Sequence, residues 1–106
     1  MANLDMDTII FQLINYGGTA KSLAYEALDE ALAGKYDEAD KLLKESDEQL
    51  MMAHDIQTGI IQEEAAGNKT EVSVLFVHAQ DHLMTAMEAK HLIECIIKLK
   101  KKVDEK

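Results

Sequence analysis

The feature that most constrains the fold of this chain is the absence of proline from all of its 106 residues. Proline breaks helices and glycine weakens their interiors, so long stretches with few of these residues are typical of long helices. The five glycines are Gly17, Gly18, Gly34, Gly59 and Gly67. Gly34 and Gly67 each follow a helix-like stretch, and glycine is the usual residue just past a helix end. The sequence therefore predicts three helices of roughly 30 residues each, joined by tight turns.

The expected helix boundaries follow from capping residues. The first helix is expected from Met6 to Ala33. The second is expected to have its N-cap at Asp37 and to run to about Ala66. The third is expected to follow a cap at Thr70 and to continue to the lysine-rich end of the chain, where positive charge suits the helix dipole.

One segment, residues 72–77, is rich in β-branched and apolar side chains and by propensity alone would form a strand. We expect a helix there, because a lone strand would have no partner and helical apolar spacing continues from Leu75 onward. Short connections make consecutive helices antiparallel. The predicted fold is therefore all-α, an antiparallel up-down-up three-helix bundle in one domain spanning residues 1–106.

Each expected helix carries an inner stripe of residues spaced three and four apart, as helix packing requires. The first stripe is Met6, Ile10, Leu13, Gly17, Ala20, Ala24, Ala27 and Ala31. The second stripe is Ala39, Leu43, Ser46, Leu50, Ala53, Gln57 and Ile60. The third is Leu75, His78, His82, Thr85, Ala89, Leu92, Ile96, Leu99 and Val103. The pair Gly17-Gly18 indicates either a bend or a closely packed neighbouring backbone, and we favour close packing. Apolar residues beyond these stripes predict self-association.

Charge and cysteine content exclude several functions. A net charge of −9 and a pI near 4.8 argue against binding to nucleic acid or anionic membranes, because both rely on attraction to phosphate. Cys95 is the only cysteine, and its isoleucine neighbours predict a buried thiol. The sequence shows neither a targeting segment nor a run of about 18 apolar residues, so we expect a cytoplasmic protein without membrane insertion.

A polar stretch interrupts the apolar seam near the start of the third expected helix. Its residues at three and four spacing, which share one helix face, are His78, Asp81, His82 and Thr85. Two histidines four residues apart can bind one divalent metal, although Ala79 stands where a metalloprotease carries its glutamate. A neutral imidazole can also be the nucleophile that accepts a phosphoryl group. The spacing leaves three interpretations open: metal binding, histidine phosphorylation or a structural polar seam.

Three further polar residues, His54, Gln57 and His91, lie outside this stretch. His54 and Gln57 lie three residues apart on the second expected helix, with Gln57 on its inner stripe. We interpret His54 as a structural residue and Gln57 as an amide at the core edge; the alternative is that both approach the histidine stripe. His91 is interpreted as a surface residue.

Three stretches together are similar to a known family: His78-Ala79-Gln80-Asp81-His82-Leu83-Met84-Thr85, Ala53-His54 with Gln57-Thr58, and Gly18-Thr19-Ala20-Lys21-Ser22. They resemble the IIA component of the lactose/cellobiose class of the bacterial sugar phosphotransferase system, over nearly the whole chain. The resemblance implies a phosphotransferase component that works as a cytoplasmic phosphocarrier. Nε2 of His78 would accept a phosphoryl group from phospho-HPr and pass it to a cysteine of the cognate IIB component. The IIC membrane component then phosphorylates the incoming disaccharide.

The resemblance also implies a homotrimer about a threefold axis, with the phosphorylated histidine in a groove between subunits. Asp81 of each subunit would meet at a buried divalent metal, and Mg²⁺ prefers such oxygen ligands. His82 is expected beside His78, where it would hydrogen-bond the phosphoryl group or orient the donor. Gln80 is expected to assist.

Two details of the sequence favour one sugar class. Ala79 and the preceding 75–77 segment look more like relatives of the cellobiose, chitobiose or lichenan type than of the lactose type.

The competing hypothesis is a trimeric metal-binding helical bundle without phosphotransfer. In that protein His78 and His82 would both be metal ligands.

Overall fold

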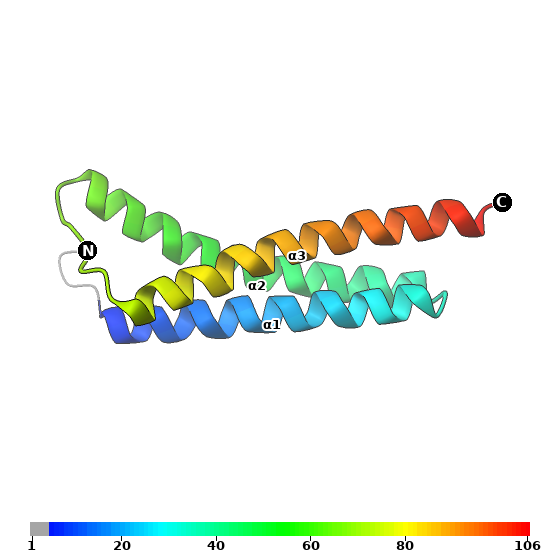
Figure 1. The fold of residues 1–106 in the computed structure, drawn as a ribbon, viewed down its shortest axis with the longest axis horizontal. Coiled ribbons are helices and arrows are strands. Elements are labelled where there is room, and N and C mark those ends of the chain that lie inside the picture. Colours follow the sequence, from blue (N-terminus) through cyan, green and yellow to red (C-terminus); the bar gives the residue numbers. More distant parts are fainter. Residues whose placement is uncertain (1–4) are drawn as a thin grey trace.

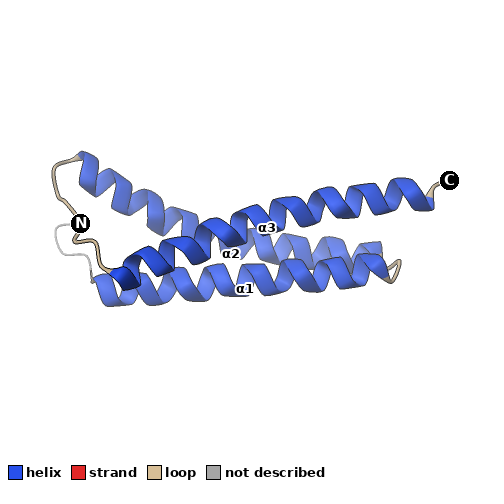
Figure 2. Cartoon of the chain, in the orientation of Figure 1, coloured by secondary structure: helices blue, strands red, loops and turns tan. Residues whose placement is uncertain are grey.

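The fold is a bundle of three long helices. The computed structural model describes residues 5–106, so residues 1–4 of the predicted domain lie outside the described part. α1 spans Met6–Leu32, α2 spans Tyr36–Ala65 and α3 spans Val74–Asp104, with consecutive helices running in opposite directions (Figure 1). The described part measures 56 × 21 × 20 Å and contains no strand (Figure 2). The predicted all-α up-down-up bundle is confirmed.

The glycine positions predicted to end the first two helices are confirmed. Gly34 and Gly67 have φ angles of 81° and 96°, in the left-handed region that favours glycine. At the other end of α1, the carboxylate of Asp5 accepts hydrogen bonds from the hydroxyl of Thr8 at 2.6 Å and from its backbone N–H at 3.4 Å. These bonds lower the pKa of the Asp5 carboxyl below its ordinary value.

Two of the predicted N-caps are wrong. Lys35 occupies the N-cap position of α2, so Asp37 lies in the first turn, because the turn from α1 is so short. α3 is capped by Ser73, whose hydroxyl accepts a hydrogen bond from the backbone N–H of Phe76 at 3.1 Å, and not by Thr70. Because α3 begins at Val74, three residues later than a Thr70 cap would place it, residues 66–73 form the loop from α2. Phe76 in the first turn of α3 is then buried. Burying a phenylalanine outweighs the choice between two hydroxyl caps.

Replacing Ser73 with alanine is expected to lower the free energy of unfolding by about 1 kcal/mol, because the start of α3 loses its side-chain cap. Thermal unfolding followed by circular dichroism measures the change. Thr70→Val is the matched control: the Thr70 hydroxyl is buried and makes no hydrogen bond within residues 5–106, so its removal is expected to be neutral or stabilising. A larger loss in Thr70→Val than in Ser73→Ala would show that Thr70 is the cap after all.

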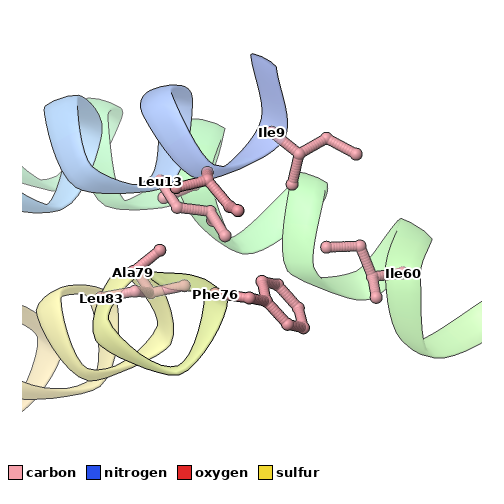
Figure 3. Packing of buried hydrophobic residues seen from close by; sticks show 8 residues of the cluster. Ile9, Leu13, Ile60, Phe76, Ala79 and Leu83 are labelled. Carbon is pink, nitrogen blue, oxygen red and sulfur yellow. The ribbon is translucent and has the colours of Figure 1, made fainter. Parts of the chain in front are cut away.

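α1 lies against both other helices and supplies the centre of the core. One cluster, drawn in Figure 3, lies near the starts of α1 and α3 and consists of Ile9, Ile10, Leu13, Ala53, Ile60, Phe76, Ala79 and Leu83. A second cluster consists of Ala24, Ala27, Ala31, Ala39, Ile93 and Ile97. The fully buried hydroxyl of Ser46 donates a hydrogen bond to the carbonyl of Ala20 at 2.7 Å, which satisfies the one polar side chain of the second stripe that is fully enclosed. The inner stripes predicted for the first two helices are confirmed as buried or half-buried.

α1 and α3 approach closely at Gly17. A methyl group on Gly17 would lie 3.3 Å from the backbone carbonyl of His82 and from the backbone nitrogen of Leu83. Nothing lies within 4 Å of the same position on Gly18. α1 continues through both residues as one helix, so the predicted close packing is confirmed and belongs to Gly17 alone.

The face of α3 that packs within the chain is not the predicted one. The buried residues are Phe76, Ala79, Leu83, Ala86, Lys90, Ile93 and Ile97. The large apolar members of the predicted seam are 45% to 63% exposed: Leu75, Leu92, Ile96, Leu99 and Val103. α3 carries two apolar stripes of similar spacing, and the stripe with Ala79 and Ala86 packs inward because small side chains allow close approach to α1. Cys95 is exposed on this helix, so the predicted buried thiol is wrong.

A lysine that the sequence analysis did not single out lies on the packed face of α3. Lys90 is 8% exposed, and its ammonium pairs with the carboxylates of Asp47 on α2 and Glu94 one turn further along α3. Burial pulls the pKa of Lys90 down, but the hydrogen bonds to Asp47 and Glu94 outweigh it and leave the pKa above its ordinary value. The charged side chain therefore joins α2 to α3. In the sequence, Lys90 lies four residues after Ala86 and three before Ile93, a spacing that places it on the same helix face as these two apolar residues.

Candidate functional site

His78 and His82 form a close pair on α3. One helical turn separates them, so their rings lie on the same side of the helix. Nε2 of His78 is 3.1 Å from Nε2 of His82, and the rings meet edge to face at 85° with centroids 4.6 Å apart. One proton bridges two imidazole nitrogens at this distance, so one ring donates and the other keeps an unshared electron pair. His78 is exposed and His82 is half-buried, so His78 is the ring open to a partner.

Asp81 and Thr85 complete the predicted polar stripe. The hydroxyl of Thr85 donates to the backbone carbonyls of Asp81 at 2.8 Å and of His82 at 3.3 Å. The Asp81 side chain is exposed on the outward side of α3. Nowhere in residues 5–106 do three His, Cys, Asp or Glu side chains come together as a metal site. Within the described residues, Asp81 therefore has no two further His, Cys, Asp or Glu side chains grouped with it.

Gln80 faces α2 and not His78 of its own chain. Residues two apart on a helix project to nearly opposite sides, so the side chains of His78 and Gln80 diverge. Oε1 of Gln80 accepts a hydrogen bond at 3.4 Å from Nε2 of Gln57 on α2. The same nitrogen of Gln57 lies 3.7 Å from the sulfur of Met84. The interpretation of Gln57 as an amide at the core edge is therefore confirmed, with a partner on the neighbouring helix, and Gln80 is not part of the histidine stripe that the alternative required.

His54 and His91 lie apart from the histidine pair. Both line an open groove of about 690 Å³ between α2 and α3. The groove is lined by Asp47, Leu50, Met51, His54, Met84, Met87, Glu88, Lys90, His91 and Glu94. Both histidines are exposed, which confirms the interpretation of His91 as a surface residue. Among residues 5–106, none of the helices has the length and apolar character that a membrane span requires.

Two proteins of known description are similar in sequence to this chain over most of its length. The lichenan-specific phosphotransferase enzyme IIA component of Bacillus subtilis (strain 168) is 48% identical over 103 residues, which cover 97% of this chain and 94% of that protein. The N,N'-diacetylchitobiose-specific EIIA component of Escherichia coli (strain K12) is 40% identical over 99 residues, which cover 93% of this chain and 85% of that protein.

Solved structures are similar over the whole bundle. The cellobiose-specific enzyme IIA from Bacillus anthracis superposes with a TM-score of 0.92 at 47% identity, covering 98% of this chain and 95% of that one. A solution structure of the IIA(Chitobiose)-HPr complex superposes with a TM-score of 0.83 at 37% identity, covering 96% of this chain and 99% of that one. The family model described as "PTS system, Lactose/Cellobiose specific IIA subunit" matches residues 8–101. The chain therefore belongs to the lactose/cellobiose family of IIA subunits, as a phosphotransferase component of its cellobiose/chitobiose class.

Proposed function

We propose that this chain is the phosphocarrier of an uptake system for cellobiose- or chitobiose-type disaccharides. It accepts a phosphoryl group on Nε2 of His78 from phospho-HPr and passes it to a cysteine of the cognate IIB component. The observation that carries the proposal is the pair of His78 and His82, because a nucleophilic nitrogen lies exposed with a hydrogen-bond donor beside it. Relatives named for lichenan and diacetylchitobiose support the sugar class.

The hydrogen bond between the two imidazoles is compatible with either ring as donor, and the proposal assigns the donor role to His82. In the reactive tautomer the shared proton is on Nε2 of His82, and His78 carries its own proton on Nδ1. The electron pair on Nε2 of His78 forms the new bond to phosphorus as the bond from phosphorus to the donor breaks. The N–H of His82 then donates to a phosphoryl oxygen, where negative charge is concentrated. In the onward step the bond between Nε2 and phosphorus breaks as the thiolate of the IIB cysteine takes the phosphoryl group.

HPr is the proposed donor because a relative with the same fold has been solved in complex with HPr. The exposed position of His78 fits an encounter with another folded protein, since the nucleophile needs no opening motion of the bundle. The net charge of −9 favours a donor with a positively charged contact surface, because complementary charge speeds association.

The proposed assembly is a homotrimer about α3 with one Mg²⁺ at the Asp81 carboxylates. Leu92 and Leu99 follow Asp81 after whole numbers of helical turns, so all three share the outward face of α3, and both leucines are more than half exposed. Burying this face against two further copies would remove its apolar area from water. Three converging carboxylates repel one another unless a cation bridges them, and oxygen ligands suit Mg²⁺, which would act as a structural ion.

Asp81→Leu is expected to abolish metal binding, measured as metal per chain by elemental analysis, while trimers and phosphorylation persist. Leucine removes the carboxylates that need the cation and extends the apolar face. His78→Ala is the matched control and is expected to keep the metal. Loss of metal in His78→Ala would favour the trimeric metal-binding bundle, in which both histidines are ligands. A monomer by light scattering at micromolar concentration would overturn the proposed trimer.

The proposed function is tested by the intact mass of the protein after incubation with phosphoenolpyruvate, enzyme I and HPr. We expect each chain to gain one acid-labile phosphoryl group, and to gain none when HPr is omitted. An unchanged mass with all three components present would overturn the phosphocarrier proposal.

A further inference from the structure

The groove of about 690 Å³ between α2 and α3 has an apolar floor. Leu50 and Met51 of α2 form one side of this floor, and Met84 and Met87 of α3 form the other. Met51 is 64% exposed and Met84 is 52% exposed, so large apolar side chains in the groove are open to water. The proposed transfer step makes no use of this surface.

The groove follows the direction of the two helices. Its lining spans residues 84–94 of α3, which is about 15 Å at 1.5 Å per residue, or roughly three helical turns. α1 lies against both other helices, whereas α2 diverges from α3 toward the loop that joins them (Figure 1). Side chains of a further helix can enter a groove between two helices along its length, as ridges enter grooves in helix packing.

The rim of the groove is acidic. It carries three carboxylates, of Asp47, Glu88 and Glu94, against the one ammonium of Lys90. Lys90 is 8% exposed and pairs with Asp47 and Glu94, so its charge is directed to them. The side chain of Glu88 is exposed, and the whole chain carries a net charge of −9. The groove therefore attracts lysine and arginine side chains of a partner.

We propose that this groove is a docking site for a basic amphipathic helix of another protein. Apolar side chains of that helix pack on the methionine floor, and its lysine or arginine side chains pair with the rim. Methionine suits such a floor, because its flexible and polarizable side chain adapts to different apolar partners.

The groove lies away from the face of α3 proposed for the trimer. Met87 and His91 follow Asp81 by six and ten residues, which places them about 120° and 80° around the helix from it. The groove therefore faces another side of α3 than Asp81, and the inference does not depend on the proposed phosphocarrier function.

The probe for the test is a fluorescein-labelled peptide of about 14 residues, built from leucine and lysine with the leucines at helical spacing. Its control is the same peptide with glutamate in place of lysine. Fluorescence anisotropy at about 0.15 M salt is expected to show saturable binding of the lysine peptide at micromolar concentration. The glutamate peptide is expected to bind at least about tenfold more weakly, because its charges meet an acidic rim.

Substitutions in the floor and the rim locate the binding. Met51→Gln is expected to weaken binding of the lysine peptide about tenfold, because an apolar contact is lost. Met52→Gln is its matched control, since Met52 is exposed on the same helix but does not line the groove. Glu88→Lys is expected to weaken binding about tenfold by reversing a rim charge. Glu26→Lys makes the same change of net charge at an exposed position of α1.

Both control variants are expected to bind within about twofold of wild type. Equal weakening within each pair of variants would show general attraction to an acidic protein and would overturn the inference. It would also be overturned by a lack of saturable binding up to about 1 mM lysine peptide. If a second copy of this chain occupies the groove instead, light scattering will show a lower mass for Met51→Gln than for wild type, which contradicts docking of another protein.

Discussion

Replacing His78 with alanine is expected to abolish phosphorylation of this chain by phospho-HPr. The imidazole of His78 is exposed, and its Nε2 is the nitrogen that the neighbouring ring leaves with an unshared electron pair in the proposed tautomer. His82 does not replace the lost nucleophile in this proposal, because its ring is half-buried and less open to a donor protein than that of His78. Intact mass spectrometry after incubation with phosphoenolpyruvate, enzyme I and HPr measures the loss directly.

The His82→Ala variant distinguishes the role of His82 from that of His78. It is expected to leave His78 phosphorylated but to slow transfer about tenfold, because one donor to the phosphoryl oxygens is removed. His91→Ala is the matched control, since it removes an exposed histidine of the same helix outside the pair and is expected to behave as wild type. A phosphoryl group found on His82 in the His78→Ala variant would contradict the assignment of the nucleophile.

Replacing Gly17 with leucine is expected to destabilise the bundle by about 3 kcal/mol or more, because its side chain would enter the backbone of α3. Even a single methyl group there would lie 3.3 Å from backbone atoms of His82 and Leu83, and helix backbone cannot move aside as a flexible side chain can. The displaced segment carries the histidine pair, so phosphorylation is expected to slow as well. Thermal unfolding at fixed protein concentration measures the loss of stability.

Gly18→Ala is the neighbouring control. Nothing lies within 4 Å of a methyl group at this position, so alanine only improves the helix and is expected to raise the free energy of unfolding by about 1 kcal/mol. A loss of stability at Gly17 beside a gain at Gly18 would show that Gly17 is needed for the close approach of the α3 backbone. A Gly17→Leu variant as stable as wild type would contradict the close packing of α1 against α3.

Much of the candidate site could be predicted from the order of residues along one helix. The i, i+4 spacing of His78 and His82 is enough to place their rings together, and the structure does so at 3.1 Å. The partner of Gln80 could not be predicted in this way, because Gln57 belongs to a different helix and meets it only when α2 and α3 pack. The ion pair of Lys90 with Asp47 escaped prediction for the same reason.

The sequence by itself determined the number of helices, their approximate ends and the inner faces of α1 and α2, because proline-free stretches, glycine ends and 3.6-residue periodicity are local properties. Only the tertiary structure decided which face of α3 packs inward. α3 carries two apolar stripes, and the stripe that packs inward includes Ala79 and Ala86, whose small side chains allow α1 to come close. That choice leaves His78 and Asp81 exposed on the other side, where a donor protein or further copies of the chain can reach them.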